Sequence, residues 1–423
     1  MRRLFTAAIV VGVLAATCAI SASIASARSS ATPIMVGGDG DLALFPGIVQ
    51  GFDAGIYRFN KDGGLDGRKI DFTGFLDDGL SATTNLTNAQ QLVENNHVMA
   101  IVPFGSEVAG AATSTYLAKA KVPFIGWSTD ASFTSQPKWG FGITGNEVDV
   151  HVESSSLMKQ VLVASGQKAA NKVRIAIVGV NVPVGVTAVA SSVGSAKAEG
   201  FHVVYHKAPI PVIGTTSYAP YVQALIASGA NVVLELLDAP TSVGLSAGLK
   251  GAGFKGQIVN SLTYYPGQLA SQPNEASALA GVYVDWPFPA NEDDSPAVIQ
   301  AERDLKAVGA SPYLNQGVTV GYWSAIVFEQ MLKATLKAVG GDPNKVTSQT
   351  LQKTVNSGFT YADPLAGGIG TEYFPAAENI PTGCSTLLKI VGNTYKQVTP
   401  FQCLGDVNIV TLKKVNPKTG KDA

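Results

Sequence analysis

Three hydroxyl-bearing residues in the first third of the chain stand where a parallel sheet would place a bound ligand. Ser106 follows the apolar run 98–104, and Ser128 and Thr129 follow the run 122–125. A short apolar run between turn signals, with a helical pattern after it, is typical of a buried parallel strand. Because ligands in such sheets sit beyond the carboxyl ends of the strands, the three residues predict the floor of a binding crevice.

Elsewhere the chain lacks the residue patterns that most catalytic sites require. It has no G-x-S-x-G nucleophile elbow and no phosphate-binding loop with its lysine. Gly38-Asp39-Gly40 begins like a dinucleotide fingerprint, but no third glycine follows at the required spacing. His202 and His206 could form half of a metal site, although an exposed pair on an edge strand is the favoured interpretation without further ligands nearby. We therefore expect no enzyme activity, no metal and no cofactor.

The elements that would position these residues alternate along the chain. Strand and helix patterns follow one another from residue 34 onward, which predicts an α/β fold with parallel sheets and helices on both faces. A second set begins near Glu147, with strands expected at 173–178, 202–205, 231–237 and 257–259. Residues 281–289 interrupt the alternation, and long helices are expected at 297–308 and 315–339. We interpret these helices as a return of the chain to cover the first sheet.

Composition favours large cores and argues against nucleic acid as a partner. Of 423 residues, 46% are hydrophobic and only 14% are charged, which allows two or three domains of ordinary size. The net charge is −1. Removing residues 1–27 leaves 28 basic against 31 acidic residues, or −3. This balance provides no electrostatic basis for binding nucleic acid or an anionic membrane surface.

The first residues have the pattern of an export signal. Arg2 and Arg3 precede the apolar stretch 4–16, which is too short to span a bilayer, and Ala25-Ser26-Ala27 forms a cleavage site. We expect a signal peptide at residues 1–27 and a periplasmic, cell-surface or extracellular location. Residues 14–18 also resemble a degraded lipoprotein box, so lipid anchoring through Cys18 remains an alternative to cleavage after Ala27.

Only two cysteines lie beyond this signal. Cys384 and Cys403 flank an expected hairpin whose turn is Gly392-Asn393. In an oxidising compartment a structural disulfide between them is the natural interpretation, and two reduced buried thiols are the alternative.

Several motifs resemble the type I periplasmic solute-binding proteins, the leucine/isoleucine/valine-binding family that feeds ABC importers. The most specific is the turn Gly63-Gly64-Leu65-Asp66-Gly67-Arg68 between the first helix and the second strand. The resemblance also covers residues 51–55, 60–70, 77–78, 98–106, 122–125, 128–130, 172–178 and 321–325.

The resemblance implies two doubly wound Rossmann-like lobes joined by a three-segment hinge. Lobe 1 would comprise residues 33–146 and 287–360, lobe 2 residues 147–286 and 361–415, and residues 416–423 a tail. In this family the ligand binds between the lobes and shifts the hinge equilibrium toward a closed form that the permease recognises.

By the same resemblance, the strand-end hydroxyls would hold a ligand carboxylate. Ser106, Ser128 and Thr129 would use hydroxyls and backbone N–H groups at helix N-termini. For Ser106 a plain helix cap is an equally good explanation.

The second lobe departs from the amino-acid binders of the family. Those carry an acidic residue that pairs with the ligand ammonium, whereas the matching stretch here, 260–265, has no carboxylate. Asp238 could substitute, or could be a helix cap. Where an acid followed by Tyr-Gly is common, this chain has 181–185, beginning with Asn181. Aromatic residues could line the cleft, although each alone is more often core: Phe104, Trp127, Tyr264, Tyr265 and Trp286.

The sequence therefore predicts an exported, monomeric solute-binding protein that works with ABC permease subunits. Its ligand would be a branched-chain amino acid or a similar small hydrophobic carboxylate. A non-amino-acid aromatic or hydrophobic acid or amide is a serious alternative. Two other functions stay open, an exported ligand sensor without a transport role and a secreted α/β enzyme.

Overall fold

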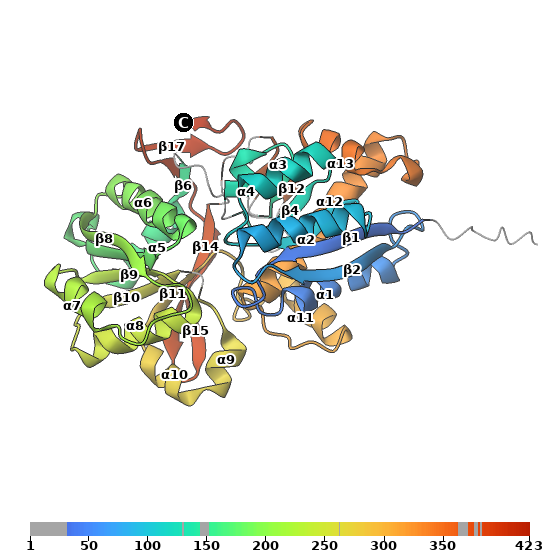
Figure 1. Cartoon of the computed structure of the whole chain (residues 1–423). Coiled ribbons are helices and arrows are strands. Elements are labelled where there is room, and N and C mark those ends of the chain that lie inside the picture. The colour runs from blue at the N-terminus through green and yellow to red at the C-terminus, as the bar shows by residue number, and fades with distance from the viewer. Residues whose placement is uncertain are drawn as a thin grey trace, which may run out of the picture.

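The computed structural model describes residues 32–128, 131–143, 152–261, 263–362, 371–375, 380 and 383–423. The chain forms two lobes, each built on a central sheet with helices on both faces (Figure 1). The predicted α/β class is confirmed. The expected signal peptide with Cys18 lies outside the described residues. Within them, no helix is both long and apolar enough to cross a membrane.

The first sheet consists of five parallel strands in the order β2-β1-β3-β4-β5. They are β1 (Ile34–Gly40), β2 (Ile70–Asp77), β3 (Ala100–Gly105), β4 (Phe124–Gly126) and β5 (Gly140–Gly142). The first strand continues through Gly37 and Gly38 to Gly40. The strand order 2-1-3-4-5 is a doubly wound order, which places a crevice where β1 and β3 diverge.

Helices cover both faces of this first sheet. On one face lie α2 (Ala82–Glu94), α3 (Ala111–Ala120) and α4 (Ala131–Ser135), which bury Leu92, Leu117 and Phe133 against β3 and β4. On the other face lie α1 (Ile48–Lys61) and the returning helices α11 (Pro296–Ala307), α12 (Gln316–Ala338) and α13 (Ser348–Val355). The long helices after residue 296 therefore do cover the first sheet, as expected.

The second sheet repeats the same strand order and adds a hairpin. Its order is β15-β14-β11-β10-β9-β7-β8, in which the last five are parallel and again follow 2-1-3-4-5. The strands are β7 (Arg174–Val180), β8 (His202–Ile210), β9 (Val232–Leu236), β10 (Gln257–Ser261), β11 (Tyr283–Trp286), β14 (Cys384–Val391) and β15 (Thr394–Cys403). The last two pair antiparallel as the predicted hairpin, and the predicted disulfide joins Cys384 to Cys403.

Within the described part of the chain, six helices pack on the second sheet. The helices α5 (Ser155–Ser165) and α6 (Pro183–Ala198) share one core with its strands. Residues of the remaining four belong to the larger core: α7 (Ala219–Ala227), α8 (Ala239–Gly251), α9 (Pro266–Ser271) and α10 (Pro273–Leu279).

Small sheets and short turns complete the described structure. Strands β6 (Val152–Ser154), β16 (Asp406–Asn408), β17 (Lys413–Asn416) and β18 (Lys421–Asp422) form one sheet, while β12 (Thr360–Ala362) pairs with β13 (Thr371–Tyr373). Two 3-10 turns occur at Ala170–Lys172 and Pro343–Lys345. Residues 416–423, expected as a tail, thus include a strand that pairs with β17.

The two lobes are connected by the chain after β11, which leads into α11 (Figure 1). The other two expected hinge segments lie largely in residues outside the described part, 144–151 and 363–370 with 376–379.

Candidate functional site

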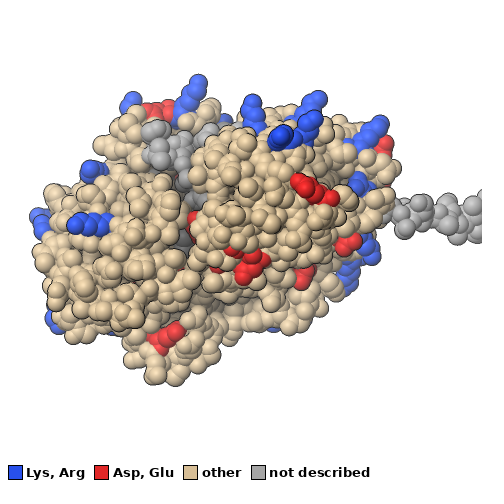
Figure 2. Space-filling view, in the orientation of Figure 1, with Lys and Arg blue, Asp and Glu red and all other residues tan. Residues whose placement is uncertain are grey.

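A cavity of about 330 Å³ lies between the carboxyl ends of the two sheets. Figure 2 shows the furrow that separates the two lobes on this face. Residues from both lobes line the cavity, and most of the lining side chains are apolar. From the first lobe come Leu44, Leu80, Glu107, Val108 and Gln316. From the second come, among others, Leu157, Val180, Val182, Val184, Val212, Leu236, Leu237, Tyr265 and Pro287.

The charged groups in this lining are all acidic. Glu107, Asp238 and Asp285 contribute carboxylates, and none of the described lining residues is Lys, Arg or His. A carboxylate solute would find no cationic partner among these residues. An ammonium, amide or hydroxyl group would find acceptors.

Asp238 lines the cavity, but its carboxylate is already engaged as a helix cap. It precedes α8, where Oδ1 accepts hydrogen bonds from the backbone N and the hydroxyl of Thr241 at 3.0 and 2.7 Å. Oδ2 accepts from the backbone N of Ile213 at 3.1 Å. The contacts of Asp238 are therefore those of a helix cap. A ligand that binds this carboxylate would have to share its two oxygens with Thr241 and Ile213.

Asp285 is a lining carboxylate that the sequence did not single out. It lies in β11, is 5% exposed, and its Oδ1 has no hydrogen-bond partner among the described residues. Burial raises the pKa of Asp285 from 3.8 to about 7, an effect that the neighbouring Ser385 hydroxyl opposes. In the sequence, Asp285 is a single acid within the apolar stretch Val282–Trp286. An acid in this position is also common where a strand ends at a loop, so the sequence alone does not indicate a binding residue.

Ser106 lies beside the cavity, and its hydroxyl is used within the protein. The side chain is fully buried, donates a hydrogen bond to Asp78 Oδ2 at 2.6 Å, and accepts from the backbone N of Ala109 at 3.0 Å and of Val108 at 3.2 Å. Burial raises the pKa of Asp78, while the bond from Ser106 counteracts the shift. Ser106 does not belong to the described lining, although its neighbours Glu107 and Val108 do.

The other two residues predicted to bind the ligand from the first lobe are Ser128 and Thr129. Ser128 is buried just after β4 and does not belong to the described lining. Thr129 lies outside the described residues. Whether these two hold a ligand therefore stays a prediction.

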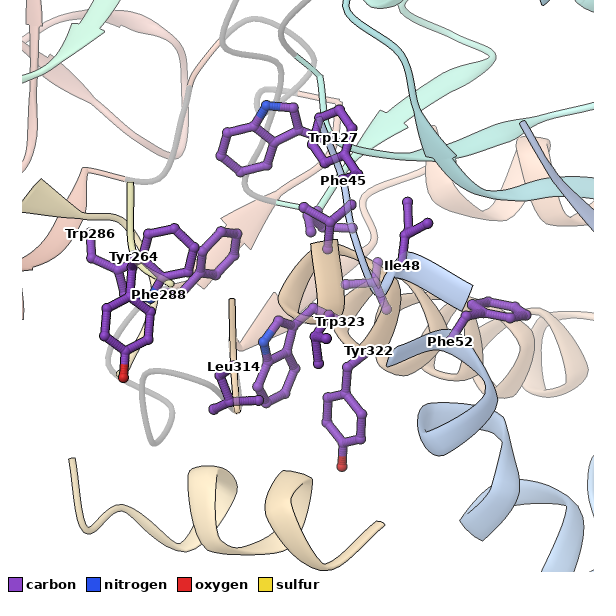
Figure 3. Close-up of a cluster of buried hydrophobic side chains, with 14 of the residues drawn as sticks. Phe45, Ile48, Phe52, Trp127, Tyr264, Trp286, Phe288, Leu314, Tyr322 and Trp323 are labelled. Atoms are coloured by element: carbon purple, nitrogen blue, oxygen red, sulfur yellow. The ribbon is translucent and has the colours of Figure 1, made fainter. Parts of the chain in front are cut away.

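Most of the predicted aromatic residues form a core between the lobes. Trp127 packs on Phe288 with ring centroids 5.6 Å apart, and Phe288 packs on Trp286 at 5.4 Å. Tyr264 extends this row to Trp286, with ring centroids 5.3 Å apart (Figure 3). Its ring also packs on that of Tyr395 at 4.8 Å.

The hydroxyl of Tyr264 is also engaged away from the cavity. It donates to Glu292 Oε2 at 2.7 Å and accepts from the backbone N of Asn291 at 2.9 Å, both in the segment between the lobes. Trp127 and Tyr264 do not belong to the described lining of the cavity, and their ligand role stays a prediction.

Tyr265 does line the cavity, and it bridges the lobes. Its hydroxyl donates to Oε1 of Gln316, at the start of α12, at 3.2 Å. Asn181 is exposed and does not belong to the described lining, although Val180 and Val182 on either side do, so its ligand role stays a prediction. In an extended or turning segment, adjacent side chains point in different directions.

The histidine pair behaves as the favoured interpretation predicted. His202 and His206 are exposed on β8, the edge strand of the second sheet. The described part of the chain holds no group of three His, Cys, Asp or Glu that could bind a metal ion.

Comparison with known proteins identifies relatives of this architecture. Residues 35–394 match a family model described as periplasmic binding protein. A search of the curated proteins finds no match.

Three solved structures illustrate the structural likeness. A fatty acid ABC transporter substrate-binding protein from Thermomonospora curvata is 20% identical with a TM-score of 0.72, covering 92% of this chain and 96% of that one. An R. palustris solute-binding protein in complex with 4-hydroxybenzoate is 19% identical (TM-score 0.68; 88% and 97% covered). A Thermus thermophilus branched-chain amino acid ABC transporter structure with bound valine is 14% identical (TM-score 0.69; 88% and 96% covered).

Proposed function

This chain belongs to the periplasmic binding protein family, and we propose that it is the solute-binding component of an ABC importer. It would capture a small hydrophobic solute between its lobes, with a branched-chain amino acid as the first candidate. The observation that carries the proposal is the apolar cavity lined from both sheets. A solute that contacts both lobes binds the closed arrangement better than the open one, and so shifts the hinge equilibrium toward it.

The chemistry of the lining supports an amphipathic solute. Apolar side chains such as Leu80, Val108 and Val182 would contact its hydrocarbon part. The lining carboxylates would accept hydrogen bonds from an ammonium group, and Ser128 and Thr129 remain the candidates for a carboxylate.

A non-amino-acid acid or amide is the second candidate. Of the three similar structures, one contains valine, one contains 4-hydroxybenzoate and one is a fatty acid ABC transporter substrate-binding protein. The fold therefore accommodates all three classes of solute. The apolar walls of this cavity suit an aromatic or aliphatic group as well as a branched side chain.

Export through the signal at residues 1–27 and interaction with permease subunits belong to the same proposal. Retention through a lipid on Cys18 is its alternative form. The proposal assigns no reaction to the chain.

A thermal-shift screen of the purified mature protein tests this function. Amino acids, aromatic acids, aliphatic acids and amides are added separately, and a solute that binds only the folded state raises the melting temperature. We expect leucine, isoleucine or valine to produce a shift of several degrees at millimolar concentration. If all three fail while an aromatic or aliphatic acid succeeds, the amino-acid assignment is wrong. Failure of every class would contradict solute capture itself.

A further inference from the structure

Two neighbouring buried polar groups that line the cavity make no hydrogen bond of normal geometry with a described residue, although one, a hydroxyl, lies close enough to the other, a carboxyl, to lower its pKa. They are Oδ1 of Asp285 and the hydroxyl of Ser385. Both side chains line the cavity and are almost fully buried, with 5% and 2% of their surface exposed. Native proteins rarely leave buried polar groups without hydrogen bonds, so each such group needs an explanation, and a bound molecule is one.

Strand pairing places these groups on one surface. Asp285 in β11 is opposite Ser261 in β10 and opposite Leu387 in β14. Ser385 is two residues before Leu387, so it points to the same side of the sheet. Ser261 lines the cavity as well. The three side chains form a polar floor, which we call the β11–β14 floor, in a cavity whose lining is mostly apolar.

The position of the floor is held by neighbouring structure. The disulfide joins Cys384, the residue before Ser385, to Cys403 on β15. Gln160 of α5 donates a hydrogen bond to the backbone oxygen of Ser385 at 3.3 Å. Preorganised polar groups of this kind bind a matching group without rearrangement, which favours affinity and selectivity.

Building on the proposed function, we propose that the β11–β14 floor binds the polar head of the solute. Asp285 there accepts a hydrogen bond from an N–H group, either an ammonium or an amide, and Ser385 completes the contact. The hydrocarbon part of the solute extends along Leu157, Val180 and Leu236 toward the first lobe. Asp285 is then a specificity-determining residue, because a carboxylate head placed at this floor would meet another carboxyl group and no cation.

The charges of the whole lining also favour a solute with an N–H group over one with a carboxylate. Glu107 and Asp238 are also acidic, and no described lining residue is basic. Burial raises the pKa of Asp285 because the ionised form loses hydration there, and an N–H donor on the solute would stabilise that form.

Matched trios of solutes provide the test. Each trio carries an amine, a primary amide or a carboxylic acid on the same hydrocarbon, with isobutyl, hexyl and phenyl groups as the three hydrocarbons. Dissociation constants are measured by calorimetry on the purified mature protein. We expect the amine and the amide of at least one trio to bind roughly tenfold or more tightly than the matching acid.

Substitutions then test which residues cause the tighter binding of amines and amides. Asp285→Asn exchanges an acceptor oxygen for an N–H donor, so it should weaken amine binding roughly tenfold and strengthen acid binding. Ser385→Ala, a second variant that leaves the acid in place, should weaken amide binding several-fold. Glu235→Gln is the matched control, because Glu235 is a buried acid of the same sheet whose oxygens accept hydrogen bonds from Ser246. It should leave the ratio of amine to acid affinity unchanged.

The outcomes separate this inference from the function on which it rests. Tighter binding of acids than of amines, or an unchanged ratio in Asp285→Asn, would overturn the role of Asp285 while leaving solute capture intact. If no member of any trio binds although leucine, isoleucine or valine raises the melting temperature, the inference fails while solute capture stands. If the amino acids fail as well, the proposed capture of a small hydrophobic solute fails with it.

Discussion

Glu235 is a buried carboxyl group that should make the stability of the protein depend on pH. It is fully buried in β9 and accepts hydrogen bonds from the Ser246 hydroxyl at 3.1 and 3.2 Å. Burial raises the pKa of Glu235 from 4.5 to about 8, although hydroxyl groups of α8 oppose the shift. The folded protein therefore keeps this proton over a range in which the unfolded chain has lost it.

The sign of the pH effect follows from this difference. Between pH 4.5 and 8 the folded state binds more protons than the unfolded state, so the contribution of Glu235 to stability falls as pH rises through that window. We predict that Glu235→Gln reduces the loss of unfolding free energy between pH 5 and pH 8 by on the order of 2 kcal/mol or more. Urea unfolding at the two pH values measures this, and an equal loss in both proteins would contradict it.

Ser106 provides a second prediction for a single residue. Its hydroxyl bonds to Asp78 and to two backbone N–H groups, so Ser106→Ala leaves a buried carboxylate with one partner fewer. We predict a loss of about 1–3 kcal/mol in unfolding free energy. The affinity for the solute found in the thermal-shift screen should change less than threefold. A large loss of affinity at unchanged stability would restore the direct ligand contact suggested by the sequence.

Among the elements, α1 and α12 show why two sequence motifs contain small residues. A methyl group on Gly321 would lie 2.0 Å from the carbonyl oxygen of Ile48, and one on Gly51 would lie 2.0 Å from that of Val318. The two helices can approach this closely only with glycine at these positions. The motifs at 51–55 and 321–325 therefore mark the packing of the returning chain on the first helix.

We predict that Gly321→Ala lowers the unfolding free energy by about 1–3 kcal/mol, because the added methyl group forces the helices apart. Gly251→Ala is the matched control. Gly251 is the last residue of α8, is exposed, and has no described atom within 4 Å of an added methyl group. That change should be neutral or stabilise by up to about 1 kcal/mol. Equal destabilisation by both substitutions would argue against the close-packing explanation.

For the whole molecule, charge distribution should influence binding only weakly. The chain has a net charge of −1, and the lysines and arginines visible in Figure 2 lie mostly toward the outline of the molecule. The cavity contains acids but no described base. Its interaction with a solute thus depends on short-range contacts rather than on a long-range field.

We predict that the affinity for a zwitterionic or neutral solute changes less than about threefold between low and high salt. Calorimetric titrations of the solute identified by thermal shift, in 20 mM and 500 mM sodium chloride, test this. A solute with only a carboxylate would instead bind more tightly at high salt, because screening reduces its repulsion by the lining acids.

The sequence by itself determined the elements and their class. Apolar periodicity and turn residues are local properties of the chain, so α12 (Gln316–Ala338) lies within one residue of its predicted range 315–339. Strands β7, β9 and β10 lie within two residues of their predicted ranges. The disulfide was predictable for a similar reason, since Cys384 and Cys403 flank one hairpin.

Only the tertiary structure decided which residues line the cavity. Asp285 and Ser385 are 100 residues apart in sequence, and they share a floor because β11 pairs with β14. Ser106, Trp127 and Tyr264 follow strand ends as expected, but their side chains contact other parts of the protein. Ser106 bonds to Asp78, Trp127 packs on Phe288, and Tyr264 bonds to Glu292. The physical reason is that a side chain's neighbours depend on strand order and face, which the local pattern does not specify.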